Sequence, residues 1–178
     1  MKIKPHWIVI GIAAAIGLAG GVFIGVERSR AAQRAIDTLY ATSLPDLESR
    51  PQAFSQWKTK TLVINYWATW CEPCREEIPA LTRMQAKYSS KSVQIVGIAL
   101  DSPDKVQAFA KSYGINYPLF IGGMGMMDLM HAQGNDIGAL PFTVIVSPGG
   151  VRARTHLGAL SEPQMESLIA EAQSDKSG

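Results

Sequence analysis

Cysteine and histidine are both scarce in this chain. Only Cys71 and Cys74 are present among 178 residues, so a small scaffold stapled by several disulfides is excluded. The three histidines, His6, His131 and His156, are scattered along the chain. A structural zinc site usually takes four cysteine or histidine ligands, and this distribution disfavours one.

A large excess of charge of either sign is also missing. The chain has 17 basic and 15 acidic residues, a net charge of +2. No basic patch of the kind that binds nucleic acid is apparent, so we expect no nucleic-acid partner. With 47% hydrophobic and 18% charged residues, the composition is that of an ordinary globular protein. The length favours one domain with attachments.

The N-terminus contains a long uncharged run. Residues 7–26 carry no charged side chain and are followed by Glu27-Arg28-Ser29-Arg30. As a helix they would span roughly 30 Å, enough to cross a bilayer core. We therefore predict a membrane anchor at residues 1–26. A cleaved signal peptide is the alternative, but its apolar region is usually shorter, about 7–15 residues.

Two further features of this run concern topology and pairing. Lys2 and Lys4 precede it, and arginines follow it, so the flanking charges nearly balance. We favour an extracytoplasmic domain on the bacterial inner (cytoplasmic) membrane, facing the periplasm. Small residues recur every four positions, at Gly17, Gly21 and Gly25, and would let two such helices pack closely as a dimer. The alternative is that glycine is simply common in membrane helices.

The remainder of the chain alternates between strand and helix patterns. We expect a linker at 27–43, a domain at 44–174 and a tail at 175–178. Proline and glycine mark several helix ends, such as Pro103 and Gly114. The predicted strands are 61–67, 93–100, 117–121, 142–147 and 151–157; the predicted helices are 74–88, 102–113, 126–133 and 161–173. No internal repeat or second domain is found.

The chemistry is concentrated in Cys71-Glu72-Pro73-Cys74, between a predicted strand and a predicted helix. A helix N-terminus offers unpaired N–H groups and a partial positive charge, both of which favour a thiolate. Cys71 is therefore the expected nucleophile, and Cys74, one turn along, the resolving thiol. A purely structural disulfide is the main alternative, but it would close a very short loop and gain little stability.

The segment from Asn65 to Pro79, with its Trp-Cys-x-x-Cys core and helix proline, resembles the active-site strand and helix of thioredoxin-like proteins. It is most similar to the TlpA/ResA type of membrane-tethered thiol–disulfide oxidoreductase. The resemblance covers about residues 44–174. It implies an α/β thioredoxin fold, a central mixed β-sheet flanked by helices, preceded here by one transmembrane helix. It also implies no cofactor beyond the Cys71–Cys74 disulfide, and no metal.

The resemblance assigns roles to further residues. Pro141 would be the family's cis-proline facing the sulfurs, and Leu140 would pair its main chain with an extended client segment. Trp70, Glu72 and Pro73 would line the substrate-binding surface. Glu77 lies one helical turn beyond Cys74, and its carboxylate would tune the protonation of the site.

Two residues bear on proton transfer and on the direction of the reaction. Asn65 stands where thioredoxins carry a buried aspartate, so the proton acceptor must be another group. Glu72 disfavours a strongly stabilised Cys71 thiolate, which favours a reductant over a disulfide-forming oxidase. The expected partners are cysteine-containing clients, such as apocytochrome c or oxidase copper-site proteins, and a membrane or extracytoplasmic dithiol electron donor.

Alternatives to this function are a disulfide-forming oxidase or isomerase, and a non-enzymatic copper-site assembly chaperone. The copper alternative depends on a methionine-rich stretch, since thioethers and imidazole bind Cu(I). Methionine also fills irregular gaps in a core, and that explanation is simpler. A peroxidase is disfavoured because no cysteine lies in a Pro-x-x-x-Thr/Ser-x-x-Cys setting. The stretch contains Met124, Met126, Met127, Met130 and His131.

Overall fold

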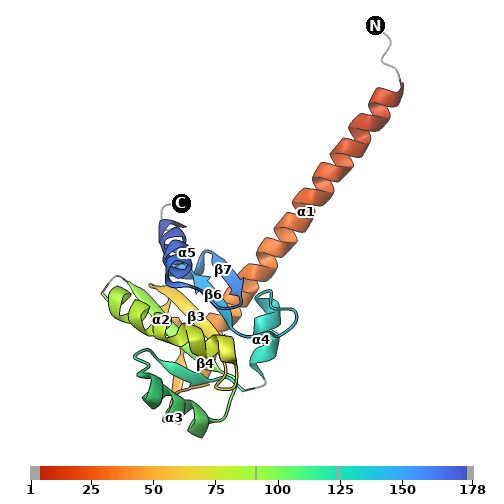
Figure 1. Cartoon of the computed structure of the whole chain (residues 1–178). Coiled ribbons are helices and arrows are strands. Elements are labelled where there is room, and N and C mark those ends of the chain that lie inside the picture. Colours follow the sequence, from red (N-terminus) through yellow and green to blue (C-terminus); the bar gives the residue numbers. More distant parts are fainter. Residues whose placement is uncertain (1–4, 91, 124, 176–178) are drawn as a thin grey trace.

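A five-stranded mixed sheet forms the centre of the computed structural model, which describes residues 5–90, 92–123 and 125–175 (Figure 1). The strand order is β5-β4-β3-β6-β7. Three strands run parallel, and β6 and β7 are each antiparallel to their neighbours. The strands are β3 (Thr61–Trp67), β4 (Val93–Ala99), β5 (Leu119–Ile121), β6 (Phe142–Val146) and β7 (Ala153–Leu157). All five lie within the predicted strand ranges, and the α/β fold is confirmed.

Helices connect and cover these strands, as the sequence predicted. Gly114 ends α3 in the left-handed conformation, with φ of 62°, which glycine adopts without steric cost. In α5, Ser161 and Gln164 form a capping box that satisfies N-terminal N–H groups. The helices are α1 (Pro5–Ala41), α2 (Glu72–Tyr88), α3 (Pro103–Tyr113), α4 (Met126–Ala132) and α5 (Glu162–Ser174).

The sheet buries a separate apolar cluster on each face. Val63, Trp67 and Ile95 face the first cluster, together with side chains of α2, α3 and α5. Leu62 and Ile64 face the second, together with side chains of α1 and α4. Successive residues of a strand point to opposite faces, so the central strand β3, all of whose residues are buried, contributes to both clusters.

The C-terminal end of α1 belongs to the domain. Ile36, Leu39 and Tyr40 are buried in the second cluster, and the Gln33 side chain donates to the Gly150 carbonyl at 3.1 Å. Their spacing places them on one helix face, which packs beside β6 and β7. The expected linker over 27–43 therefore overlaps the core at its C-terminal end. In Figure 1 the rest of α1 extends away from the sheet.

Within the described residues, none of the helices is both long enough and apolar enough to cross a membrane. The anchor over residues 1–26 thus remains a prediction, and residues 1–4 of it lie outside the described residues.

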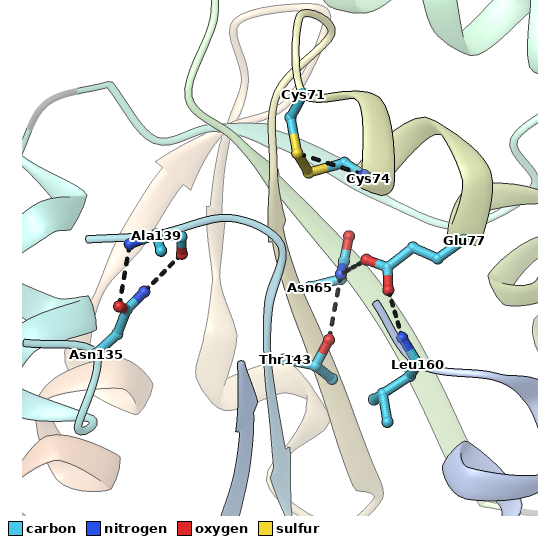
Figure 2. The surroundings of a disulfide bond; sticks show 8 residues. All are labelled: Asn65, Cys71, Cys74, Glu77, Asn135, Ala139, Thr143 and Leu160. Atoms are coloured by element: carbon cyan, nitrogen blue, oxygen red, sulfur yellow. Dashed lines mark hydrogen bonds between the residues drawn. A yellow bond between two sulfur atoms is a disulfide. The ribbon is translucent and has the colours of Figure 1, made fainter. Parts of the chain in front are cut away.

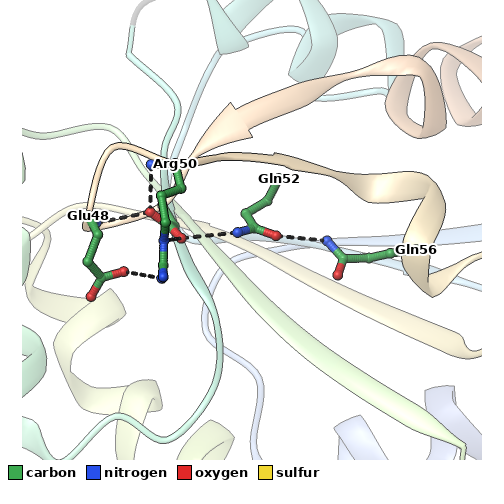
Figure 3. Close-up of polar contacts among 5 residues, drawn as sticks. Glu48, Arg50, Gln52 and Gln56 are labelled. Atoms are coloured by element: carbon green, nitrogen blue, oxygen red, sulfur yellow. Dashed lines mark hydrogen bonds and ion pairs between the residues drawn. The ribbon is translucent and has the colours of Figure 1, made fainter.

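A small hairpin that the sequence did not reveal covers the β5 edge of the sheet. It consists of β1 (Ser43–Pro45) and β2 (Pro51–Ala53), followed by the short helix η1 (Phe54–Trp57). The Asp46 carboxylate accepts hydrogen bonds from Arg50 and Gln52, and Asp46 also bridges to β5 at Phe120. Figure 3 shows this chain of polar contacts, which continues to Gln56. Three-residue strands containing proline lack the alternation that identifies longer strands.

Candidate active site

The two cysteines form a disulfide at the junction of β3 and α2 (Figure 2). Cys71 is the N-cap residue of α2, and its Sγ accepts a hydrogen bond from the Cys74 N–H at 3.3 Å. Pro73 occupies the first turn, where its fixed φ suits a helix and its missing N–H costs nothing. Cys71 is 6% exposed and Cys74 is fully buried. The predicted pairing is confirmed, and Cys71 is the sulfur nearer to solvent.

This geometry favours a thiolate at Cys71 once the disulfide is reduced. Its sulfur lies at the helix N-terminus, where unpaired N–H groups and the helix dipole stabilise negative charge. The Cys74 N–H already points at it. The arrangement therefore supports attack by Cys71 and resolution by the inner Cys74.

The Leu140–Pro141 peptide bond is cis, as predicted, and precedes β6. The Pro141 carbonyl accepts from the Gly158 N–H at 2.9 Å, which ties this loop to the end of β7. In the described part of the chain, the Leu140 backbone N–H and C=O make no hydrogen bond. An extended client segment could thus pair with Leu140 by strand addition.

Glu77 is buried on α2, at 3% exposure, and points toward Asn65 on β3 (Figure 2). Its Oε1 accepts from Asn65 Nδ2 at 2.6 Å, and its Oε2 accepts from the Leu160 N–H at 3.0 Å. Burial raises the pKa of the Glu77 carboxyl to about 7, although both hydrogen bonds lower it in part. Glu77 can therefore exchange a proton near neutral pH.

The surroundings of Glu77 include partners that sequence reasoning missed. Asn65 Nδ2 also donates to Thr143 Oγ1 at 3.2 Å, which connects β3 to β6. The Leu160 N–H comes from the segment before α5, far along the chain. Burial raises the pKa of Tyr117, and the negative charge of Glu77 raises it further. The sequence indicated only Glu77, by its spacing from Cys74, and Asn65, by its place in the family motif; it gave no signal for Thr143, Leu160 or Tyr117.

Glu77 also lines a pocket of about 470 Å³ between α2 and the segment that begins α5. Ala159 and Leu160 form one wall, and Glu76, Ala80 and Arg83 of α2 form another. The pocket brings solvent-accessible space next to this buried residue.

Two other predicted site residues lie on the surface beside the disulfide. The Trp70 side chain is 68% exposed, directly before Cys71. Glu72 is also exposed and lines a small pocket with Arg75 and Tyr113. Large exposed aromatic side chains are frequent anchors in protein interfaces, so Trp70 suits contact with a client.

The described methionines of the methionine-rich stretch lie on α4 and contribute to the core. Met130 is fully buried in the second cluster, while Met126 and Met127 are half-buried against it. Met124 lies outside the described residues. In the part of the chain that the structure describes, no group of three or more histidine, cysteine, aspartate or glutamate side chains could hold a metal ion.

Comparison with known proteins shows which family the chain is similar to. The family model described as "AhpC/TSA family" matches residues 36–154, which include Cys71, Cys74, Glu77 and Pro141.

The chain belongs to the AhpC/TSA family.

Individual relatives specify the activity. Thiol-disulfide oxidoreductase ResA of Halalkalibacterium halodurans is 28% identical over 176 residues, 94% of this chain and 95% of that protein. Thioredoxin-like protein YneN of Bacillus subtilis is 33% identical over 131 residues, 71% of this chain and 74% of that protein. The crystal structure of a thioredoxin-related protein from Neisseria meningitidis serogroup B superposes with a TM-score of 0.68 at 34% identity, covering 74% of this chain and 98% of that one.

These similarities and the Cys71–Cys74 pair identify the AhpC/TSA family member as a ResA-like thiol–disulfide oxidoreductase with a thioredoxin-like fold. Its clients are proteins that contain cysteine. The sequence interpretation of the fold, the enzyme class and the redox pair is confirmed.

Proposed function

We propose that this oxidoreductase works as a reductant of client disulfides outside the cytoplasm, held at the bacterial inner membrane by residues 1–26. The observation that carries the proposal is the site itself: a solvent-side sulfur capping a helix N-terminus, above a buried carboxyl with a pKa of about 7. Cysteine pairs of apocytochrome c or of oxidase copper-site proteins are the proposed clients. A membrane or extracytoplasmic dithiol is the proposed electron donor.

The reaction proceeds in two exchange steps. The Cys71 thiolate attacks one sulfur of the client disulfide, and the other client sulfur leaves as a thiolate and is protonated. Cys74 then loses its proton and attacks Cys71 Sγ, which breaks the mixed disulfide. The client leaves as a dithiol, two electrons have passed to it, and the Cys71–Cys74 disulfide has formed.

Glu77 accepts the proton of Cys74, a role that the amide of Asn65 cannot fill. Cys74 is fully buried, and burial in apolar surroundings raises the pKa of a thiol, so the second step needs help. Glu77 lies one helical turn beyond Cys74, and a carboxyl with a pKa of about 7 is half-ionised at neutral pH. The pocket that Glu77 lines between α2 and α5 is where the proton would pass to solvent.

The reduction potential of the Cys71–Cys74 pair in the full-length protein tests the direction of the reaction. Equilibration with glutathione or dithiothreitol buffers, followed by thiol alkylation, measures it. A value near that of thioredoxin, about −270 mV, supports a reductant supplied by an electron-delivery chain. A value near about −120 mV, that of a strongly oxidising dithiol protein, would mean that the protein introduces disulfides.

A further inference from the structure

The loop between α4 and β6 contains a buried asparagine with an unusual set of partners. Asn135 is 2% exposed, and both ends of its carboxamide bond the same residue. Its Nδ2 donates to the Ala139 carbonyl at 2.8 Å, and its Oδ1 accepts from the Ala139 N–H at 3.1 Å. Figure 2 shows this reciprocal pair on the loop that leads into β6.

The backbone of Asn135 is fixed as well. Its N–H donates to the Met130 carbonyl of α4 at 2.9 Å, and its carbonyl accepts from the Gly138 N–H at 3.2 Å. Every polar group of Asn135 therefore has a partner. The asparagine connects α4, a helix packed in the second cluster, to the residue that precedes Leu140.

The orientation of one peptide unit follows from these contacts. The Ala139–Leu140 peptide is trans, so its C=O and its N–H point in opposite directions. Because the Ala139 carbonyl points to Asn135, the Leu140 N–H must point away from Asn135. Asn135 thus sets the direction in which Leu140 presents its donor.

Leu140 is flanked by backbone groups that are already occupied. Both polar groups of Ala139 bond Asn135, and the Pro141 carbonyl bonds Gly158 while proline has no N–H. Within the described residues, Leu140 alone in this stretch keeps both backbone groups open. An extended strand pairs with a residue by exchanging bonds with its N–H and its C=O, which fits this site.

We propose that Asn135 is a positioning residue that holds the Leu140 backbone open for an extended client segment beside the disulfide. The inference rests on the proposed function, the reduction of client disulfides by Cys71, and adds that the client segment pairs with Leu140 as it reaches Cys71. Asn135 makes no contact with the reacting sulfurs. Its loss should weaken reactions that use a peptide backbone and leave the dithiol chemistry intact.

Two disulfide probes with the same leaving group separate these effects. One is an extended peptide whose central cysteine is disulfide-bonded to cysteamine, and the other is cystamine, which has no peptide backbone. The second-order rate constant of the reduced full-length protein is measured with each. The variants are Asn135→Asp and Asn135→Ala. Ionised aspartate keeps the size of asparagine but cannot donate to the Ala139 carbonyl.

Both variants should react about tenfold more slowly with the peptide, the effect of losing roughly one net hydrogen bond, and within twofold of wild type with cystamine. The control Asn116→Asp removes a matched amide-to-carbonyl bond, to Thr82 on an exposed surface, and should change neither rate. N-methylation of the peptide beside its cysteine should slow the wild type strongly and the Asn135 variants little, because the pairing is already impaired.

Equal losses with both probes, or no loss with the peptide, would overturn the role of Asn135. A wild-type protein that reacts no faster with the peptide than with cystamine, and equally fast with the N-methylated peptide, would contradict client pairing at Leu140 and overturn the inference. The proposed reducing function would still be decided separately by the reduction potential. If Asn135→Ala does not fold, the isosteric Asn135→Asp decides the outcome.

Discussion

The two faces of the sheet are both buried, yet only one of them carries chemistry. The face toward α2 and α5 holds the disulfide, Glu77, Asn65 and Thr143. The face toward α1 and α4 is filled by aliphatic and aromatic side chains and, among the described residues, has no buried carboxyl or thiol. The same strands, β3 and β6, supply both faces.

The difference shows how a small domain separates stability from function. Burying apolar side chains stabilises the fold at about 25 cal/mol per Å². Burying a carboxyl costs stability unless it is protonated or well hydrogen-bonded. Among the described residues, Asn65 Oδ1, Trp67 Nε1 and Tyr117 Oη on the reactive face are buried without a hydrogen-bond partner, and so is Tyr40 Oη on the apolar face. The apolar face offsets these costs.

Truncating the apolar face should give the largest effect. Leu39→Ala removes a fully buried side chain from the second cluster and should lower the free energy of unfolding by about 3–5 kcal/mol. Urea unfolding of the full-length protein measures this. The rate of disulfide exchange by the folded protein should remain within twofold. Thr38→Ala, an exposed neighbour on α1, should change the stability by less than about 0.5 kcal/mol. A Leu39→Ala protein with wild-type stability but a reduced rate of disulfide exchange would contradict the assignment of stability to one face and chemistry to the other.

The buried carboxyl on the reactive face should make the stability of the protein depend on pH. The pKa of Glu77 is raised from 4.5 to about 7 in the folded protein, so the folded state holds its proton more tightly than the unfolded state. The contribution of Glu77 to the free energy of unfolding is fully present below pH 4.5 and is lost as the pH rises through about 7. The loss is roughly 3 kcal/mol.

Glu77→Gln should remove that decline, because a glutamine does not titrate. Unfolding free energies measured across this pH range for wild type and variant provide the test. Glu76→Gln changes an exposed carboxyl on the same helix and should keep the wild-type slope. An unchanged slope in Glu77→Gln would assign the pH dependence to another group.

The exposed rim of the reactive face should matter least for stability. Trp70 is 68% exposed, so Trp70→Ala should alter the free energy of unfolding by under about 0.5 kcal/mol. We expect the exchange rate with a protein disulfide to fall about fivefold, the loss of roughly 1 kcal/mol of client contact. Val151→Ala, an exposed apolar residue beyond the opposite end of β6, is the control and should leave the rate unchanged. Equal rates for Trp70→Ala and wild type would remove Trp70 from the client-binding surface.

The sequence predicted those parts of the site that depend on local pattern. Cys71 and Cys74 stand between a buried strand and a helix, so their places follow from neighbouring residues. The cis-proline at Pro141 was implied by the family resemblance and is also found. The Leu160 N–H bonds Glu77 across 83 positions, and the Asn135 contact depends on the path of an irregular loop. Neither leaves a periodic signal in the sequence.

The same limit applies to the fold. Strands 61–67 and 93–99 are long apolar runs and were predicted with nearly correct ends. The hairpin β1–β2 was missed because its strands are short and contain proline. The helical end at 36–40 was assigned to a linker because only the three-dimensional packing shows what its apolar face covers.

The central claim is that the solvent-side Cys71, and not Cys74, forms the bond to the client. Cys74→Ser full-length protein, incubated with a disulfide-containing client peptide, should accumulate a mixed disulfide that mass spectrometry maps to Cys71, whereas Cys71→Ser should accumulate almost none. A stable adduct through Cys74 in the Cys71→Ser protein, with none in Cys74→Ser, would contradict the account.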